Sequence, residues 1–182
     1  MTDASFDPTH AVRFDLAHGA VHAGAHGERL VMVPSAALEQ WVALAPQESS
    51  EGLGRAMGTA IGRRAAARIE SLVSASPELF ITQLAGEAAM AGLGTLSVER
   101  WGRALVVLVD DCPLPTSLLA AFVAGAIEAS TGRGVSTLLL DRDGGSARVL
   151  VTGEPGTRRV RDWMAEGETW GAALARLQRR SA

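Results

Sequence analysis

Two periods of hydrophobic and polar residues follow one another along the chain, and they predict both strands and helices. Alternating or Val-rich runs predict strands, whereas apolar residues at i, i+3 and i+4 predict helices with one buried face. The predicted strands are 12–16, 29–33, 95–99, 104–109 and a hairpin over 136–151. The predicted helices are 35–44, 51–74, 77–90, 117–130 and one or two within 155–178. This order predicts an α+β fold, with an antiparallel sheet packed against a helical layer.

Turn and cap residues mark the boundaries of these elements. Residues 24–27 predict the turn of the first hairpin, and residues 143–145 predict the turn of the last one. Ser35, Ser76 and Thr116 are predicted N-caps, because a hydroxyl oxygen can accept a hydrogen bond from the free N–H groups of the first helical turn.

Three glycines recur at every fourth residue of the predicted helix 51–74. Gly54, Gly58 and Gly62 would lie on one side of this helix. Each interior glycine costs about 0.5–1 kcal/mol relative to Ala, so the close approach of another backbone is the expected compensation. Gly125 lies in a second helix rich in small residues, which is the expected partner. The contact could form within one chain or between two chains, and the glycines could also form a concave wall for a ligand.

The same segment superficially matches a dinucleotide-binding fingerprint through Gly52, Gly54 and Gly58. That fingerprint requires a strand before it and an acidic ribose partner about 20 residues later. Residues 46–51, which precede the glycines, read Pro-Gln-Glu-Ser-Ser-Glu and do not form a strand pattern. The spacing therefore favours helix packing over nucleotide binding.

Composition narrows the class of protein. The 182 residues are 47% hydrophobic and 20% charged, which suits a globular domain with a full core. The net charge of −3 gives no electrostatic reason to expect a nucleic acid or an anionic membrane as partner. The single cysteine, Cys112, excludes an intramolecular disulfide and fits a reducing compartment. Without a signal-peptide pattern or a run of about 18 apolar residues, the expectation is a soluble cytoplasmic protein.

The C-terminal segment is basic, aromatic and amphipathic. Arg161, Trp163 and Trp170 could dock a protein partner, because Trp and Arg are enriched at interfaces. The favoured alternative is packing on the parent domain, and exposed tryptophans would reverse that preference. The expected parts of the chain are a flexible tail over 1–10, a domain over 11–154 and a helical extension over 155–182.

His18, His22 and His26 are spaced by four residues. On a helix they would share a face and could bind a metal, but the neighbouring glycines argue against a helix. On a strand, positions 18 and 22 lie about 13 Å apart, which is too far for one metal without a bend. Surface histidines without a metal are the better interpretation.

Asp110, Asp111 and Cys112 follow an apolar strand. Carboxylates beside a thiol could be catalytic, but no histidine is near in the sequence, and two prolines make the segment a rigid turn. Asp141 and Asp143 match only part of a calcium loop, and a hairpin turn explains them. The sequence contains no Gly-x-Ser-x-Gly motif, so no catalytic residue is predicted.

A resemblance to a known group of proteins rests on the order of the elements and on the residues between them. The carrying segments are Val31-Met32-Val33-Pro34, Leu53-Gly54-Arg55-Ala56-Met57-Gly58, the strand 106–110, Cys112-Pro113-Leu114-Pro115, the helix 121–128 and the turn Gly144-Gly145. Over about residues 28–152 this pattern resembles the TRAPP-like and four-vinyl-reductase-like domains, which include small-molecule-sensing domains of bacterial regulators and transport-particle subunits.

The resemblance implies an α/β sandwich that dimerises through its helices. It also implies an apolar channel between helices and sheet that holds an acyl chain or an aromatic ligand. Two departures limit it. The hairpin 136–151 lacks the cysteines associated with metal in some sensor domains of the group. Cys112 follows the central strand, whereas the acylated cysteine of transport-particle subunits comes early in the fold. We therefore do not expect this chain to share the metal or the acyl group of those relatives, and we expect no cofactor.

The expected function is that of a non-catalytic small-molecule-binding, lipid-binding or scaffold domain. It would form a homodimer through the glycine helix and the helix 117–130, and it would enclose an apolar cavity. The residues expected to line that cavity are Met57, Ile61, Leu119, Phe122 and Val123.

Two alternatives stay open. The first is an accessory protein or enzyme for a large apolar cofactor such as a tetrapyrrole, with Arg55, Asp110 or His22 at the mouth of a deep pocket. The second is an assembly factor whose C-terminal helices dock a larger complex or a small GTPase.

Overall fold

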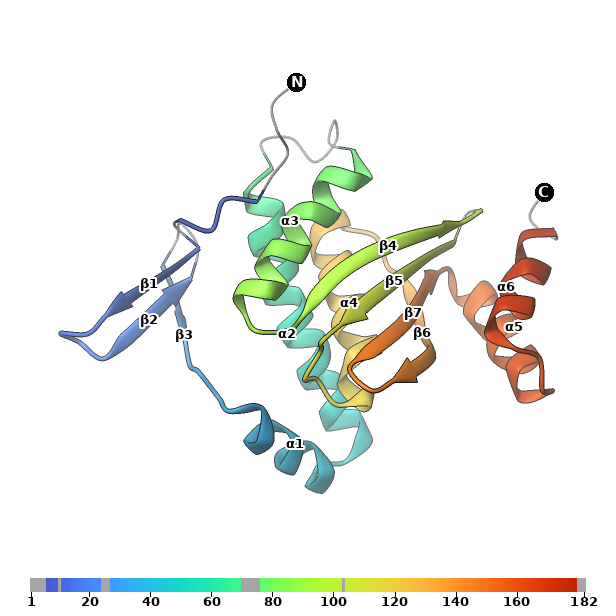
Figure 1. Ribbon diagram of the computed structural model, residues 1–182, viewed down its shortest axis with the longest axis horizontal. Coiled ribbons are helices and arrows are strands. Elements are labelled where there is room, and N and C mark those ends of the chain that lie inside the picture. Colours follow the sequence, from blue (N-terminus) through green and yellow to red (C-terminus); the bar gives the residue numbers. More distant parts are fainter. Residues whose placement is uncertain (1–5, 10, 24–26, 70–75, 103, 180–182) are drawn as a thin grey trace.

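The computed structural model describes residues 6–9, 11–23, 27–69, 76–102 and 104–179. The strands are β1 Val12–Asp15, β2 Ala20–Ala23, β3 Glu28–Leu30, β4 Thr95–Trp101, β5 Ala104–Asp110, β6 Ser136–Asp143 and β7 Ser146–Thr152. The helices are α1 Ser35–Leu44, α2 Gln47–Ala67, α3 Pro77–Met90, α4 Thr116–Thr131, α5 Glu154–Ala165 and α6 Trp170–Arg179. The fold is α+β with two antiparallel sheets, which confirms the predicted class (Figure 1).

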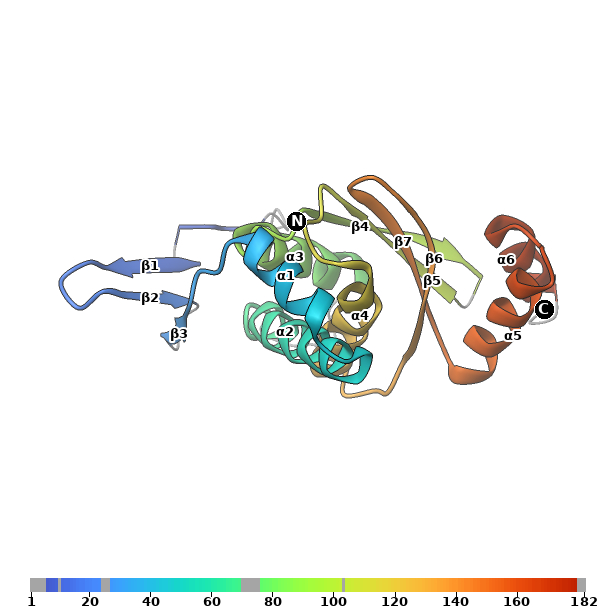
Figure 2. The same cartoon turned by 90° about the horizontal axis from the view of Figure 1, so that it is seen from below.

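A four-stranded antiparallel sheet forms the middle of the molecule, with strand order β4-β5-β7-β6. Two adjacent residues of β5, Val106 and Val107, are both buried although their side chains point to opposite faces. Val107 packs with residues of α2, α3 and α4, whereas Val106 packs with residues of α5 and α6. Helices therefore cover both faces of the sheet, as Figure 2 shows, and the central strand β5 is apolar up to its last residue, Asp110.

Helices α2 and α4 are in close backbone contact through their glycines. A Cβ at Gly58 would overlap the carbonyl oxygen of Phe122, and Gly54 and Gly62 face the α4 backbone in the same way. Gly125 of α4 fits against the α2 backbone from the other side. These contacts all lie within one chain, so this glycine surface is already occupied and is not free for a second copy.

Helices α5 and α6 cover the second face of the sheet with a smaller core. Val160, Trp163, Leu174 and Leu177 are buried there. The ring of Trp170 meets the ring of Trp101 edge to face, with centroids 6.1 Å apart. The aromatic residues of the C-terminal segment thus hold its two helices on the sheet.

The N-terminal arm is defined as residues 11–23 and 27–44. Its small sheet projects from the rest of the molecule, whereas its helix α1 lies against the helical layer (Figures 1 and 2). The arm contains the three-stranded sheet β1-β2-β3 and helix α1. The predicted pair of strands is wrong, because the chain already turns between β1 and β2, where Gly19 has φ +58°. Residues 31–33 lie beyond the end of β3. Most of the predicted turn 24–27 lies outside the described residues.

The predicted helix starts are correct in one case and wrong in two. Ser76 is the N-cap of α3, and its hydroxyl accepts an N–H at 3.1 Å. Ser35 and Thr116 are instead the first residues of α1 and α4, because Pro34 and Pro115 hold extended ψ angles and take the N-cap position. In the described part of the chain, no helix combines the length and the apolar character needed to cross a membrane.

Helix α2 begins earlier than predicted. The predicted connector before residue 51 is helical from Gln47, with Pro46 as N-cap. Described helical residues end at Ala67, and the predicted last turn over 70–74 lies outside the described residues. Within α2, the buried positions include Gly54, Ile61 and Ala65, which match the predicted apolar and small-residue face.

Candidate functional site

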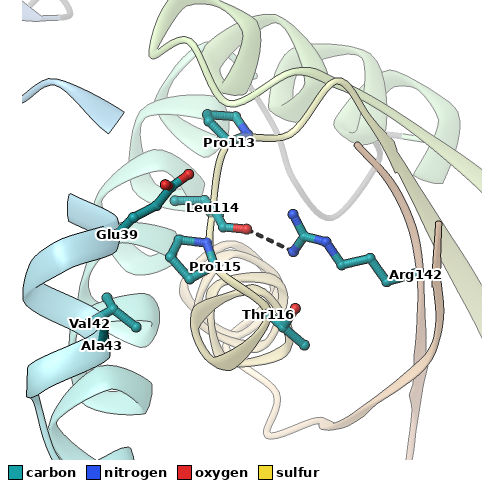
Figure 3. Close-up of a pocket in the computed structure, with 8 residues that line it drawn as sticks. All are labelled: Glu39, Val42, Ala43, Pro113, Leu114, Pro115, Thr116 and Arg142. Atoms are coloured by element: carbon teal, nitrogen blue, oxygen red, sulfur yellow. Dashed lines mark hydrogen bonds between the residues drawn. The ribbon is translucent and has the colours of Figure 1, made fainter. Parts of the chain in front are cut away.

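An open pocket of about 430 Å³ lies between α1, the loop that joins β5 to α4, and β6 (Figure 3). Its volume falls within the range of about 300–1,000 Å³ that is usual for small-molecule sites. The residues that line it are Glu39, Val42, Ala43, Pro113, Leu114, Pro115, Thr116 and Arg142.

The β5–α4 loop forms a rigid wall of this pocket. The backbone leaves β5 through Asp111, whose φ of +54° lies in the left-handed region. Cys112 then donates its backbone N–H to the carbonyl oxygen of Gly145 at 3.1 Å, which ties the loop to the β6–β7 turn. Pro113 and Pro115 have fixed φ angles and no N–H group, so the loop between strand and helix has little freedom.

Arg142 on β6 is the main polar group of the pocket. Its Nη1 donates to the carbonyl oxygen of Leu114 at 2.8 Å (Figure 3). Its Nη2 donates to the carbonyl oxygen of Cys112 at 3.3 Å. A guanidinium group has five N–H donors in a planar fork. The two loop carbonyls therefore orient the side chain while further donors remain for a ligand.

The opposite wall is helix α1, which contributes a carboxylate and two apolar side chains. Glu39, Val42 and Ala43 come from this helix, and Glu39 faces the pocket with a charge opposite to that of Arg142 (Figure 3). Apolar loop residues lie between the two charges. This arrangement can hold a small molecule with an apolar body and a polar group that accepts hydrogen bonds from the guanidinium.

Cys112, in the same loop, is held in its neutral form. Burial raises the pKa of its thiol above 9.0, and this effect outweighs the opposing effects of the Leu114 backbone hydrogen bond and the positive charge of Arg142. A thiolate is the reactive form of cysteine. Asp110 and Asp111 are both exposed. The three residues therefore match a strand end and a turn better than a nucleophilic centre.

The residues predicted to line an apolar cavity come together, but in the packed core. Ile61, Leu119, Phe122 and Val123 are all buried there, and Met57 packs against them half-buried. The pocket described above is lined by a different set of residues. A cavity among the core residues stays a prediction.

The three residues predicted at the mouth of a tetrapyrrole pocket lie on different elements. Arg55 of α2 forms an ion pair with Glu128 of α4. Asp110 is exposed at the end of β5, and His22 lies on β2 with Nδ1 2.9 Å from the carbonyl oxygen of Gly27. The pocket at Arg142 is lined by none of these three.

The three histidines that were considered as metal ligands do not come together in the described residues. His18 is exposed and pairs with Asp15 at 3.0 Å. This hydrogen bond from the imidazole is the main reason why the pKa of Asp15 is lowered. His26 lies outside the described residues. Among the residues that the structure places, no group of three or more His, Cys, Asp or Glu side chains could hold a metal ion.

The residues predicted to dock a partner differ in exposure. Arg161 is exposed, whereas Trp163 is buried and lies 4.4 Å below the guanidinium carbon of Arg176. Trp170 is half-buried, with Arg148 stacked over its ring at 5.3 Å. The two tryptophans therefore serve the packing of α5 and α6 on the sheet.

The structure contains a buried ion-pair cluster that the sequence did not predict. Glu87 of α3 is only 3% exposed, and its two carboxylate oxygens accept from Nε of Arg64 at 2.9 Å and Nε of Arg68 at 2.6 Å. Arg64 also bonds Glu28 of β3 at 2.9 Å, and Arg68 donates to the carbonyl oxygen of Asp7. The cluster thereby ties the N-terminal segments to the helical layer.

The pocket was not predicted from the sequence either. Arg142 stands in an ordinary alternating strand, and Glu39 stands in a short helix whose apolar face gives no sign of a site. The only usable signal was the spacing of Pro113 and Pro115 after a buried strand, which predicts a rigid turn but not what lies opposite.

Comparison with known proteins gives a likeness of fold. No protein-family model and no curated protein matches the sequence. Among solved structures, the phenol-responsive sensory domain of the transcription activator PoxR, crystallised with phenol, superposes with a TM-score of 0.58. The sequence identity is 16%, and the match covers 78% of this chain and 84% of that one. This chain therefore has the fold of a known small-molecule-sensing domain.

Proposed function

We propose that this protein is a non-catalytic sensory domain that binds a small molecule in the pocket between α1 and the β5–α4 loop. The observation that carries the proposal is the preorganised guanidinium of Arg142, held by two loop carbonyls at the edge of an apolar pocket. The likeness to a phenol-responsive sensory domain supports this class of function.

The ligand would be small and mostly apolar, with a hydroxyl or carboxylate oxygen that accepts a hydrogen bond. Val42, Ala43 and Leu114 would contact its apolar part, and Arg142 would bind the oxygen. A carboxylate would bind more tightly than a neutral hydroxyl, because a charge-assisted hydrogen bond is about twice as strong as a neutral one. Glu39 would oppose a second negative charge on the ligand.

The resemblance to TRAPP-like and vinyl-reductase-like domains predicts a second possible ligand site, an apolar channel between the helices and the sheet. It is supported by the convergence of Met57, Leu119 and Phe122 between α2, α4 and the sheet. Binding there would require these packed side chains to move, whereas the pocket at Arg142 is open. The pocket is therefore the site that the geometry favours.

The test is a binding titration followed residue by residue. Benzoate and phenol would be added to the isotope-labelled protein while amide and methyl NMR signals are recorded. We expect the signals of Val42, Thr116 and Arg142 to shift, with benzoate binding more tightly than phenol. Shifts concentrated at Met57 and Phe122 would move the site to the core, and the absence of shifts with both probes would contradict the proposal for this ligand class.

A pair of substitutions on α1 provides the control. Ala43 lines the pocket, so Ala43→Trp should fill it and raise the benzoate Kd at least about 10-fold, or about 1.4 kcal/mol. Ala37 lies on the same helix, is exposed and does not line the pocket, so Ala37→Trp should leave the Kd unchanged. Equal effects of the two substitutions would mean that the ligand does not occupy the pocket.

A further inference from the structure

The arginine in the pocket differs from the other sheltered arginines of the described chain, because no carboxylate is paired with it. The half-buried arginines among the described residues are Arg64, Arg68, Arg142, Arg148 and Arg176. All of them except Arg142 have a carboxylate oxygen within ion-pair distance. Arg142 donates to two neutral carbonyl oxygens instead. A partly desolvated positive charge without a paired anion favours a ligand that brings one.

Helix α4 adds a second reason to expect an anion in the pocket. Its first residue, Thr116, lines the pocket, and its N-cap, Pro115, gives no side-chain hydrogen bond. The first turn of α4 contains no acidic residue. A helix N-terminus carries free N–H groups and a partial positive charge, both of which favour an anion nearby. The guanidinium and the helix terminus therefore act in the same direction.

Glu39 places a negative charge on the opposite wall of the pocket. It is the only charged residue of α1, and its side chain points toward the β5–α4 loop (Figure 3). None of the ion pairs between described residues includes Glu39. Its carboxylate oxygens are thus available to a cationic group of a ligand. Because Glu39 is exposed, water weakens this attraction but does not remove it.

The wall between the two charges offers little to a polar group. Figure 3 shows Leu114 and Pro115 between Glu39 and Arg142. Pro115 has no N–H group, and the carbonyl oxygen of Leu114 already accepts a hydrogen bond from Arg142. A ligand that reaches both charged side chains therefore has to cross this stretch with an apolar part.

We propose that the pocket selects a zwitterion with separated charges: a carboxylate bound by Arg142, an apolar spacer over Pro115, and a protonated amine that faces Glu39. This inference rests on the proposed function, because it names the class of ligand for the same pocket. The two charges stand at opposite ends of the spacer, since Glu39 and Arg142 lie on opposite sides of the loop residues (Figure 3). An amino acid with both groups on one carbon reaches only one of the two side chains.

Three benzoates that differ only opposite the carboxylate test this inference. 4-(Aminomethyl)benzoate carries a cation at that position, 4-methylbenzoate carries no charge, and terephthalate carries a second carboxylate. Their dissociation constants would be measured by NMR titration of the isotope-labelled protein. We expect the dissociation constant to rise about threefold at each step in this order, which is the size of effect that an exposed charge pair gives.

Glu39→Gln removes the charge that sets this order. In the variant the three dissociation constants should agree within about twofold, and that of 4-methylbenzoate should stay at its wild-type value. Glu166→Gln is the matched control, because it changes the net charge of the chain equally. Glu166 is exposed at the end of α5 and does not line the pocket, so its substitution should keep the wild-type order. Circular dichroism checks that both variants keep the fold.

Phenylalanine tests the separation of the two charges in the ligand. Its ammonium and carboxylate groups share one carbon, so a molecule bound through Arg142 cannot also place its amine at Glu39. Its dissociation constant should therefore be the same, within about twofold, in the wild type and in Glu39→Gln. A clear loss of phenylalanine affinity in Glu39→Gln would contradict the separated arrangement.

The outcomes distinguish this inference from the proposed function. If all three benzoates shift the signals of Val42 and Thr116 and bind equally well, the inference is overturned and the proposed function stands. An order of affinities that persists in Glu39→Gln would have the same meaning. If none of the three benzoates binds, the proposed function is overturned together with the inference.

Discussion

The body of the molecule, formed by α2 to α6 and the four-stranded sheet, differs from the N-terminal arm in how it treats apolar residues. Phe122 in α4 is 2% exposed, whereas Phe14 in β1 is 59% exposed. The body covers both faces of its sheet with its own helices. In the arm, one face of the small sheet is only partly covered, because Val21 and Leu30 are half-buried and Phe14 is exposed. The body therefore has a complete core, whereas the arm keeps several large apolar side chains at its surface.

The two regions are joined by charges as well as by the apolar contacts of Leu38 and Val42 with the core. Glu87 is buried in the helical layer, and Arg64 links it to Glu28 in the arm. A buried carboxylate is tolerated only when it is paired, and here it has two arginine partners, the second being Arg68. These ion pairs tie the sheet of the arm to the helical layer.

The largest expected effect contrasts the two phenylalanines. Phe122→Ala should lower the free energy of unfolding by about 3–5 kcal/mol, because it removes a buried ring and leaves a cavity between α2, α4 and the sheet. Phe14→Ala should change the stability of the monomer by less than about 0.5 kcal/mol, because the ring is mostly exposed there. Urea unfolding at low protein concentration measures both. Similar losses of stability for the two variants would mean that the two phenylalanine rings are not buried to different extents.

A smaller effect separates two glycines of α2. Gly58→Ala should destabilise the protein by about 1–3 kcal/mol, because the new Cβ overlaps the carbonyl oxygen of Phe122 and pushes the two helices apart. Gly52 has no atom within 4 Å of the same position, so Gly52→Ala should stabilise the protein by about 0.5–1 kcal/mol through helix propensity alone. Thermal unfolding of the two variants gives the sign directly. A stabilising Gly58→Ala would mean that the helices are not in backbone contact.

The elements with strong local signals could be predicted from the sequence. Helix α3 was predicted from residue 77 to 90 with Ser76 as its cap, and the structure gives Pro77–Met90. The last hairpin turns at Gly144, whose φ of +55° suits a glycine. The spacing of the α2 glycines also predicted the close approach of another backbone, although not whether it came from the same chain. In each case a few neighbouring residues carry the whole signal.

The pocket could not be predicted in the same way, because no neighbouring residues define it. Glu39 in α1 and Arg142 in β6 are brought to one pocket only by tertiary packing. The prediction of the strands in the arm was wrong for another reason. The glycines of residues 24–27 predicted the first turn there, but Gly19 already turns the chain, and the strands are too short for a clear period. Exposed apolar residues in the arm also look like core residues in a sequence, since burial is not encoded in residue type alone.

The smallest effect concerns pH and belongs to the body. Burial raises the pKa of the Cys112 thiol above its ordinary value of 9.0, so the folded state keeps its proton at a pH where the unfolded chain loses it. The unfolded chain then binds fewer protons than the folded state, and stability falls as pH rises above about 9, by at most about 1.4 kcal/mol per pH unit. Below that pH both states are protonated and the thiol contributes no slope.

This protein is well suited to that measurement, because few other groups titrate in the same window. It contains no tyrosine, and all 17 of its basic side chains other than histidine are arginines, which stay protonated. Urea unfolding at pH 8, 9 and 10 should show a loss of stability that Cys112→Ala removes. The absolute stability of the variant also changes through lost packing, so the slopes and not the values are compared. Equal slopes for wild type and variant would mean that the thiol ionises as easily in the folded protein as in the unfolded chain.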